Sequence, residues 1–153
     1  METVWLEWCG PFLFSNLNEY DNAALSSDAG VYTLLDSEEL EHGWGKYKLF
    51  YVGMVYGRTF RERIPEHAFG EGDEAWKWIQ RNLDGELTAK LATVTTQEGR
   101  NITESLVRDI ENLLLFRLDP PANVQGVETY TGRELKIVNE GRFTPLPDRV
   151  KFP

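Results

Sequence analysis

The stretch IENLLLFRLDPPAN, residues 110–123, places a carboxylate inside an apolar helical pattern and an asparagine after a double proline. At about 100° per residue, Glu111 projects into the same arc as several apolar side chains of this segment. Those apolar residues are Val107, Leu114, Leu115 and Leu118, whereas the polar residues Ser105, Asp109 and Asn112 project away from the arc. A core-facing ionised carboxylate is costly unless a partner or ligand compensates it. Glu111 is therefore a candidate functional residue.

Three runs of residues around this helix predict β-strands. β-Branched and aromatic residues at 31–35 and 47–53 predict two strands joined by the polar connection 36–46, and strict alternation predicts a third strand at 86–96. The tail predicts a final hairpin that turns at 139–141.

Helical patterns cover 58–70 and 72–85, in addition to the helix that contains Glu111. In the 58–70 segment, Pro65 marks either a kink or the first turn of a separate helix. Asp73 is placed to cap the helix predicted in 72–85. The Glu111 helix is predicted to follow an Asn101 cap and to end at about Leu118.

The predicted order β-β-α-α-β-α contains too few helical crossovers for a doubly wound sheet. It favours an α/β (α+β) fold with a small central antiparallel or mixed sheet of about three strands, flanked by helices.

Length and composition favour one globular domain. The chain has 153 residues, of which 41% are hydrophobic, enough for one sizeable core. It contains neither an apolar stretch near the roughly 20 residues that a membrane helix needs nor a signal-peptide pattern, which predicts a soluble cytoplasmic protein without a membrane partner. Cys9 is the only cysteine, which excludes an intrachain disulfide and fits a reducing compartment.

The net charge of -9 is unevenly distributed. Residues 1–41 contain nine acidic side chains and no Lys or Arg, so the rest of the chain is neutral overall. Five cations stand against the single Glu62 between positions 46 and 63. They are Lys46, Lys48, Arg58, Arg61 and Arg63. This surplus is either an ordinary solvated face or a surface for a phosphate backbone.

Five sequence elements occur in an order that resembles the GIY-YIG endonuclease family. They are GVY at 30–32, YVG at 51–53, Arg63 with His67 in RERIPEH, Glu111, and Asn123 in PPAN. Each is weak alone, because short strings of strand formers are common, but their order and spacing make a stronger signal. The resemblance covers a nuclease-like domain at about 28–125. It leaves an acidic N-terminal extension at 1–27 and a C-terminal tail at 126–153.

The resemblance implies a divalent-metal-dependent DNA endonuclease. By family analogy, Glu111 would hold Mg²⁺ or Mn²⁺, Tyr32 would lie near the attacking water, and Arg63 would grip the scissile phosphate. Tyr51 and His67 would position water or phosphate, and Asn123 would hold the site together. Duplex or branched DNA is the implied partner, and the products would carry 5′-phosphate and 3′-hydroxyl ends. These roles suit phosphodiester hydrolysis, which needs water activation and charge stabilisation.

The sequence leaves several alternatives open. Tyr32 and Tyr51 also fit half-buried strand aromatics, and Glu111 also fits a buried salt-bridge partner. His67 also fits a solvated helix residue, and Asn123 also fits a turn former.

The chain also departs from the family pattern. Eighteen residues separate Tyr32 from Tyr51, a longer connection than the family usually has. Residues 36–46, which include His42 and Trp44, therefore form either a loop that contacts the substrate or an insertion without a functional role. Arg61 competes with Arg63 for the catalytic role. Tyr56 joins Lys46, Lys48, Arg58 and Arg61 as a candidate nucleic-acid contact.

A second hypothesis is a catalytically silent module of the same fold that binds nucleic acid or a protein. It rests on the acidic N-terminal segment, where Trp5 and Trp8 look exposed and would serve a homodimer or a protein partner. The complete set of site residues argues against it.

Overall fold

The computed structural model describes residues 1–38, 46–70, 72–123 and 128–153. The strands are β1 (Glu2–Leu13), β2 (Ala29–Glu38), β3 (Lys46–Tyr56), β4 (Glu86–Thr96), β5 (Leu135–Gly141) and β6 (Arg149–Lys151). The α-helices are α1 (Phe60–Arg63), α2 (Glu74–Asn82) and α3 (Glu104–Leu118), and the short 3₁₀ helices are η1 (Phe14–Glu19), η2 (Ala23–Ser26) and η3 (Ile64–Ala68). None of the helices in these ranges is long and apolar enough to cross a bilayer.

The strands form one mixed sheet in the order β3-β2-β4-β1-β5-β6. The β1–β5 pair is parallel, and the other neighbouring pairs are antiparallel. The α+β class is therefore confirmed, but the sheet has six strands where about three were expected. Three of them, β1, β5 and β6, come from the sequence outside the three predicted strands. β1 lies inside the sheet, so the acidic N-terminal segment contributes a central strand.

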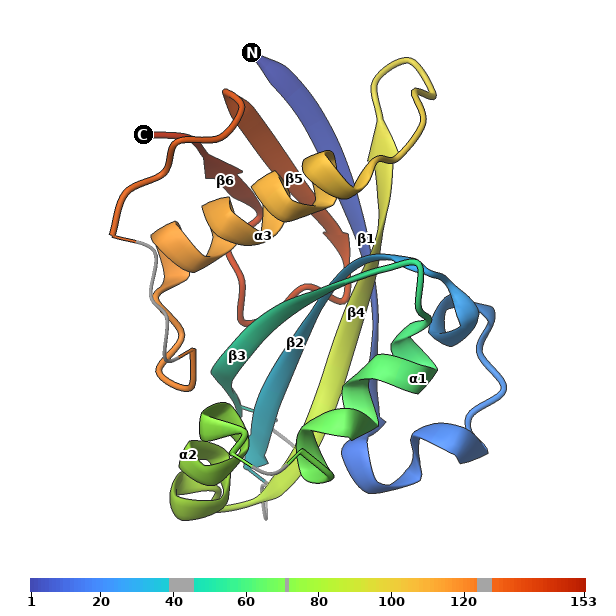
Figure 1. Cartoon of the computed structure of the whole chain (residues 1–153), viewed down its shortest axis with the longest axis vertical. Helices are drawn as coiled ribbons and strands as arrows, with labels where there is room; N and C mark the ends of the chain where they lie inside the picture. The colour runs from blue at the N-terminus through green and yellow to red at the C-terminus, as the bar shows by residue number, and fades with distance from the viewer. Residues whose placement is uncertain (39–45, 71, 124–127) are drawn as a thin grey trace.

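The helices pack against the sheet in two groups (Figure 1). Buried residues of α3 form one core cluster with residues of β1, β5 and β6 and with Val31, Val52 and Ala92 of β2, β3 and β4. Residues of α1, η3 and α2 form a second cluster with β2, β3 and β4. In Figure 1, α3 crosses in front of β5 and β6 in the upper part of the view, whereas α1 and α2 lie in the lower part. Strands β1 to β4 each contribute to both clusters, as edge strand β3 does with Val52 in the first and Phe50 in the second.

Local sequence signals explain several helix ends. Asp73 caps α2 as predicted, because its Oδ1 accepts the backbone N–H of Trp76 at 2.8 Å. Thr103 rather than Asn101 caps α3, and its hydroxyl accepts the N–H of Leu106 at 3.2 Å. Pro65 stands in the first turn of η3, directly after α1, which is the second of its two predicted roles.

The tail and the N-terminal tryptophans differ from the sequence interpretation. The predicted turn at 139–141 is wrong, because Asn139 lies within β5 and the chain reverses between β5 and β6. Asn139 is buried, where its Oδ1 accepts the indole N–H of Trp8 at 2.8 Å. Trp8 is only 2% exposed, so of the two tryptophans only Trp5 is partly accessible. Asn139 thus satisfies a buried polar group rather than forming a turn.

Glycines in the two motifs let β2 carry Tyr32 close to its neighbours. Tyr32 lies opposite Gly53 in the β2–β3 register, and a Cβ on Gly53 would come within 2.5 Å of the Tyr32 hydroxyl oxygen. A Cβ on Gly30 would come within 2.8 Å of the Phe60 ring. Both glycines are therefore needed for close packing around Tyr32.

Candidate active site

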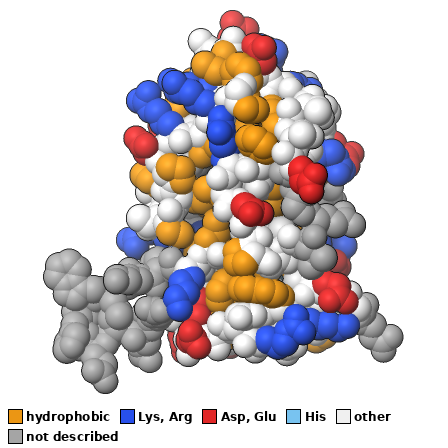
Figure 2. All heavy atoms as spheres, turned by 90° about the vertical axis from the view of Figure 1, so that its left-hand side faces the viewer, with side chains coloured by type: hydrophobic (Ala, Val, Ile, Leu, Met, Phe, Trp, Pro, Cys, Tyr) orange, Lys and Arg blue, Asp and Glu red, His pale blue; other side chains and the backbone are white. Residues whose placement is uncertain are grey.

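A cavity of about 390 Å³ opens beside edge strand β3 and collects residues from three parts of the chain. Its lining consists of Tyr51, Glu74, Ala75, Glu111, Leu115, Ala122 and Asn123. Figure 2 views the molecule from this side, where hydrophobic side chains run down the middle of the face and charged side chains of both signs surround them. Three of the six predicted catalytic residues therefore meet in one cavity: Tyr51, Glu111 and Asn123.

Glu111 projects from α3 into this cavity in partly buried surroundings. Burial raises its pKa to about 7 from an ordinary value of 4.5, while the positive charges of Arg108 and Arg63 act in the opposite direction. A carboxylic acid with a pKa near 7 can exchange a proton at neutral pH, and its ionised form can bind a cation. The two arginines lower the free-energy cost of burying this negative charge, but burial has the larger effect on the pKa.

Tyr32, Tyr51 and His67 form an aromatic group behind the cavity. The Tyr32 hydroxyl lies 2.7 Å from Nε2 of His67, and the rings of Tyr51 and His67 are 4.8 Å apart. The two tyrosine rings lie 6.0 Å apart on neighbouring strands, as predicted. Tyr32 is fully buried, however, and only Tyr51 lines the cavity. Any water in the cavity therefore meets Tyr51 first, whereas the family resemblance implies a position near Tyr32.

Burial determines the protonation states of this group. It raises the pKa of Tyr32 well above its usual value of 10 and raises that of Tyr51 as well, and the nearby Glu111 charge adds to both shifts. Burial also lowers the pKa of His67, with a further contribution from the Arg63 charge. At neutral pH the resting site therefore contains neutral phenols and a neutral imidazole.

Asn123 attaches the segment after α3 to edge strand β3. Its Oδ1 accepts the backbone N–H of Val52 at 3.0 Å, and its Nδ2 donates to the Val52 carbonyl at 2.9 Å. The neighbouring N–H of Ala122 donates to the Phe50 carbonyl at 2.9 Å. Asn123 thus pairs with β3 as a further strand would, and this pairing fixes α3 and its Glu111 against the sheet.

Arg61 and Arg63, the two rivals from the sequence, have different surroundings. Arg61 donates to the carbonyls of Leu17 and Tyr20 at 2.7 and 2.9 Å, which ties α1 to η1. The charge of Arg63 instead acts on Tyr32, Tyr51, His67 and Glu111 together. The charge of Arg63 therefore reaches the aromatic group and Glu111, whereas the Arg61 guanidinium is bound to backbone carbonyls.

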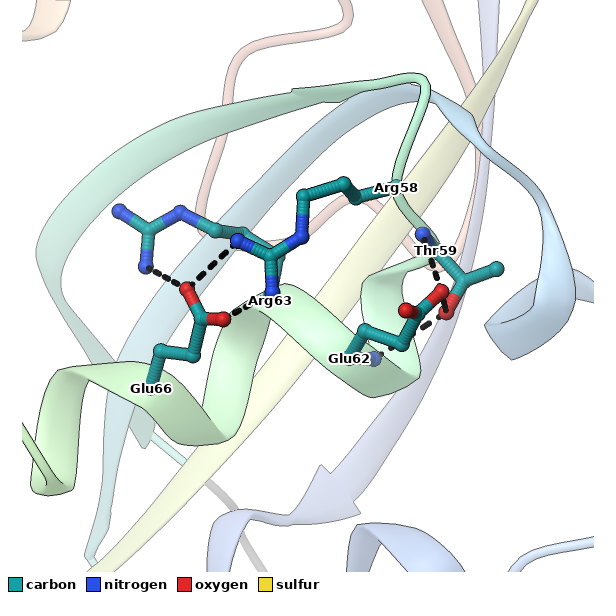
Figure 3. Close-up of polar contacts among 5 residues, drawn as sticks. All are labelled: Arg58, Thr59, Glu62, Arg63 and Glu66. Carbon is teal, nitrogen blue, oxygen red and sulfur yellow. Dashed lines mark hydrogen bonds and ion pairs between the residues drawn. The ribbon is translucent and has the colours of Figure 1, made fainter.

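Glu66 lies between Arg63 and Arg58 (Figure 3). It forms a hydrogen-bonded ion pair with Arg58, and its Oε2 lies 3.8 Å from Nη1 of Arg63. Glu62 is engaged separately with Thr59 in a capping box. Arg58 is thus neutralised by Glu66, with a further contribution from the Glu62 charge, whereas Arg63 has only the longer contact with Glu66.

The other predicted nucleic-acid contacts are less free than their sequence suggests. Lys48 lies 3.4 Å from Asp84, and Arg58 is paired with Glu66. Tyr56 is exposed at the end of β3. Lys46 begins β3, but its side chain lies outside the described residues, as do His42 and Trp44 of the 36–46 connection.

The donor set in the cavity fits a hard divalent cation. Within the described ranges, no group of three or more His, Cys, Asp or Glu side chains is arranged to hold a metal. Mg²⁺, however, usually takes only one or two protein carboxylates and keeps several waters. Glu111 would supply one such carboxylate, and Glu74, whose Oε1 lies 3.5 Å from Nζ of Lys77, lines the same cavity. A cation beside Glu111 would also offset the unfavourable burial of its charge.

Sequence reasoning missed two residues of the site. Glu74 lines the cavity, and Asp73 places its Oδ2 2.9 Å from Nδ1 of His67. Asp73 was assigned to the α2 cap, and nothing in the residue spacing indicates its second contact.

Comparison with protein-family models, curated proteins and solved structures found no match to this chain.

Proposed function

We propose that the protein is a divalent-metal-dependent DNA endonuclease of the GIY-YIG type. The observation that carries this proposal is that residues of all five motif elements converge on one place. Tyr51, Glu111 and Asn123 line the cavity, Tyr32 and His67 are joined behind it, and the Arg63 charge acts on Tyr32, Tyr51, His67 and Glu111. If Glu111 were only a salt-bridge partner and Asn123 only a turn former, the two residues would not need to lie beside the same cavity.

The arrangement of strands around the cavity also supports the proposal. β3, β2 and β4 are antiparallel neighbours, and α1, α2 and α3 connect to them in the order expected from the sequence. β1, β5 and β6 extend this unit on the β4 side, away from edge strand β3. The cavity therefore lies at the β3 side of the sheet, which these additional strands do not cover.

Each of these side chains would have a separate role in phosphodiester hydrolysis. Glu111, with Glu74 nearby, would hold Mg²⁺ or Mn²⁺, which supplies Lewis-acid stabilisation of phosphoryl charge and a more acidic water. Arg63 would present a planar guanidinium to the phosphate, since its one ion pair with the described residues is the 3.8 Å contact with Glu66. Tyr51 meets water in the cavity, and the buried Tyr32 and His67 lie behind it. Asn123 holds β3 and α3 at a fixed separation.

A cleavage assay tests the proposal directly. Duplex, branched and single-stranded DNA are incubated with and without Mg²⁺ or Mn²⁺, with Glu111→Ala and Arg63→Ala beside the wild type. We expect metal-dependent cleavage that both substitutions abolish. Glu98→Ala and Arg100→Ala are matched controls, because both residues are exposed in the turn between β4 and α3 and should leave the rate unchanged. Cleavage that survives loss of Glu111 and Arg63 would contradict the assignment.

A silent binding module of the same fold is the second candidate. The complete burial of Tyr32 favours it, because a buried phenol cannot meet a substrate directly. DNA binding measured by mobility shift on substrates that the wild type does not cut would support this alternative. A homodimer or another protein partner would instead appear as a larger species in sedimentation analysis.

A further inference from the structure

β1, β5 and β6 have α3 packed on one face, and their other face also carries apolar side chains. Leu6, Ile137 and Val150 belong to the core cluster of α3, so the alternate residues of these strands point the other way. Trp5 and Val138 lie there as neighbours in the β1–β5 register. Both are partly exposed, and neither belongs to nor packs against the two core clusters. They form the apolar centre of an open face of the sheet, which is a common feature of interaction sites.

Charges of opposite sign are separated on this open face. Lys136 lies opposite Lys151 in the β5–β6 register, and Glu7 lies beside Glu140 in the β1–β5 register. Like charges at neighbouring register positions are unfavourable, and none of these four side chains forms an ion pair with the described residues. Lys136 and Glu140 lie four residues apart on β5, which is about 13 Å at the rise of a strand. The open face therefore has a basic end and an acidic end, with the apolar centre between them.

A two-fold axis makes this pattern complementary to itself. When two copies of a sheet stack face to face, the axis lies between them and runs either along the strands or across them. An axis along the strands would place the basic end over the basic end of the second copy. An axis across the strands at Val138 places Lys136 over Glu140 of the second copy, and each apolar centre over the other. Stacked sheets are about 10 Å apart, a separation that a lysine and a glutamate side chain can bridge together.

We propose that the open face is the interface of a homodimer, in which a second copy of this chain stacks on it across a two-fold axis at Val138. The partner is a second copy because the charge pattern of the face is complementary to itself. Arg149 lies opposite Val138 at the outer edge of β6, where its exposed side chain can turn toward solvent. The neighbouring like charges, which are unfavourable in a single copy, become favourable in the dimer.

The size of the open face makes the expected dimer a reversible one. Strand spacing and rise give the face about 15 Å in each direction, an area below the roughly 800 Å² per partner of a standard interface. We therefore expect a dissociation constant in the micromolar range. Added salt should raise it, because ions screen the charges at the two exposed ends.

Dimerisation through the open face leaves the cavity of each copy accessible. β5 and β6 lie at the end of the sheet opposite to edge strand β3, and the cavity lies beside β3. None of the residues of the open face lines that cavity. The inference therefore goes beyond the proposed nuclease function and does not depend on it.

Charge reversal at the two ends tests the interface. Sedimentation velocity at low salt, without DNA or metal, measures the dissociation constant. We expect association to be at least about tenfold weaker for Lys136→Glu and for Glu140→Lys, because each substitution places like charges together at two symmetric contacts. An equimolar mixture of the two variants should dimerise again, since each reversed residue then lies over an opposite charge. The double variant Lys136→Glu/Glu140→Lys should dimerise for the same reason.

Arg81→Glu and Glu19→Lys are the matched controls. They make the same changes of net charge at exposed positions on α2 and η1, and they should dimerise like the wild type, alone and mixed. Trp5→Thr removes most of the apolar centre without a change of charge and should weaken the dimer. Circular dichroism confirms that each variant is folded.

A wild type that remains monomeric at millimolar concentration would overturn the inference, as would reversed variants that fail to associate when mixed. Duplex DNA added to a monomeric wild type tests the other occupant of the basic end. Binding that Lys136→Glu weakens and Glu140→Lys strengthens would assign this end to DNA and also overturn the dimer. Because sedimentation uses no DNA, its result decides the dimer whether or not the protein is a nuclease.

Discussion

A partly buried carboxylate on α3 is the most unusual single residue of the molecule. Glu111 lies against Leu115 and Ala122 in the lining of the cavity, and burial raises its pKa to about 7. An unfolded chain would titrate this group near 4.5, so between these two values the native state holds more protons than the unfolded state. Stability contributed by this residue therefore falls as pH rises from 4.5 through 7.

Glu111→Gln should remove this penalty. At pH 8 we expect the free energy of unfolding to rise by about 1–3 kcal/mol, at about 1.4 kcal/mol per unit of pKa and less than the full shift because the group keeps some solvent contact. At pH 4 the variant and wild type should agree closely. Urea unfolding at both pH values measures the difference.

The same variant tests metal binding. Mg²⁺ or Mn²⁺ should raise the melting temperature of the wild type at pH 8 and leave that of Glu111→Gln unchanged, because binding to the native state alone stabilises it. Glu98→Gln, an exposed carboxylate in the turn between β4 and α3, should respond to metal like the wild type. Equal shifts in all three proteins would place the cation elsewhere.

At the scale of elements, the cavity depends on how the segment after α3 is attached to edge strand β3. The two hydrogen bonds of Asn123 to Val52 occupy one backbone N–H and one carbonyl of the free edge. Unpaired groups of this kind normally invite pairing with another chain. Asn123 thus fixes the position of Glu111 and also protects part of the edge.

Asn123→Ala should destabilise the protein by about 1–3 kcal/mol, because two backbone groups lose their partners. Asn101→Ala is the matched control, since Asn101 is exposed and makes no side-chain hydrogen bond with the described residues. Chemical denaturation gives both values. Equal stability of the two variants would mean that water replaces the Asn123 side chain without cost.

The central elements of the fold were predictable because their signals are local. Alternation at 86–96 matches β4, and the predicted Asp73 cap matches the start of α2. β1 was missed although Val4, Leu6 and Trp8 alternate toward the core, because Trp5 and the acidic residues between them obscure the pattern. Asn139 was misread as a turn residue, since its value as a buried partner of Trp8 depends on a strand pairing that sequence does not reveal.

The sequence predicted that several residues of the candidate site lie close together, but it did not predict how deeply each of them is buried. Glu111, Tyr51 and Asn123 share a cavity, in agreement with their ordered spacing. Burial of Tyr32 behind Tyr51 depends on Gly53, which leaves room for the Tyr32 ring against β3. The link from His67 to Asp73 depends on how η3 meets α2. Such contacts between elements follow from packing rather than from local pattern.

At the scale of the whole molecule, the acidic N-terminal segment is a structural part of the sheet. β1 pairs with β4 on one side and with β5 on the other, and it supplies Val4, Leu6 and Trp8 to the core. Its charges lie largely at positions that these ladders leave accessible, such as Glu7. The strand is therefore needed for folding, whatever else its acidity does.

Deletion of residues 1–13 should abolish cooperative unfolding, because it separates β5 and β6 from the remaining strands. Glu7→Gln, which changes charge on the exposed side of β1, should alter the free energy of unfolding by less than about 0.5 kcal/mol. Circular dichroism during urea titration compares the two variants. A truncated chain that still unfolds cooperatively would mean that the other half of the sheet is stable alone.

The parallel β1–β5 ladder pairs Glu2 with Leu135 and so joins positions 133 residues apart. Every catalytic candidate lies between these positions, in a unit whose strands and helices follow one another closely. Loop-closure entropy delays contacts between distant positions, and folding slows as such contacts increase. We therefore expect the cavity region to gain amide-exchange protection early in refolding and β5 to gain it in the last, rate-limiting phase.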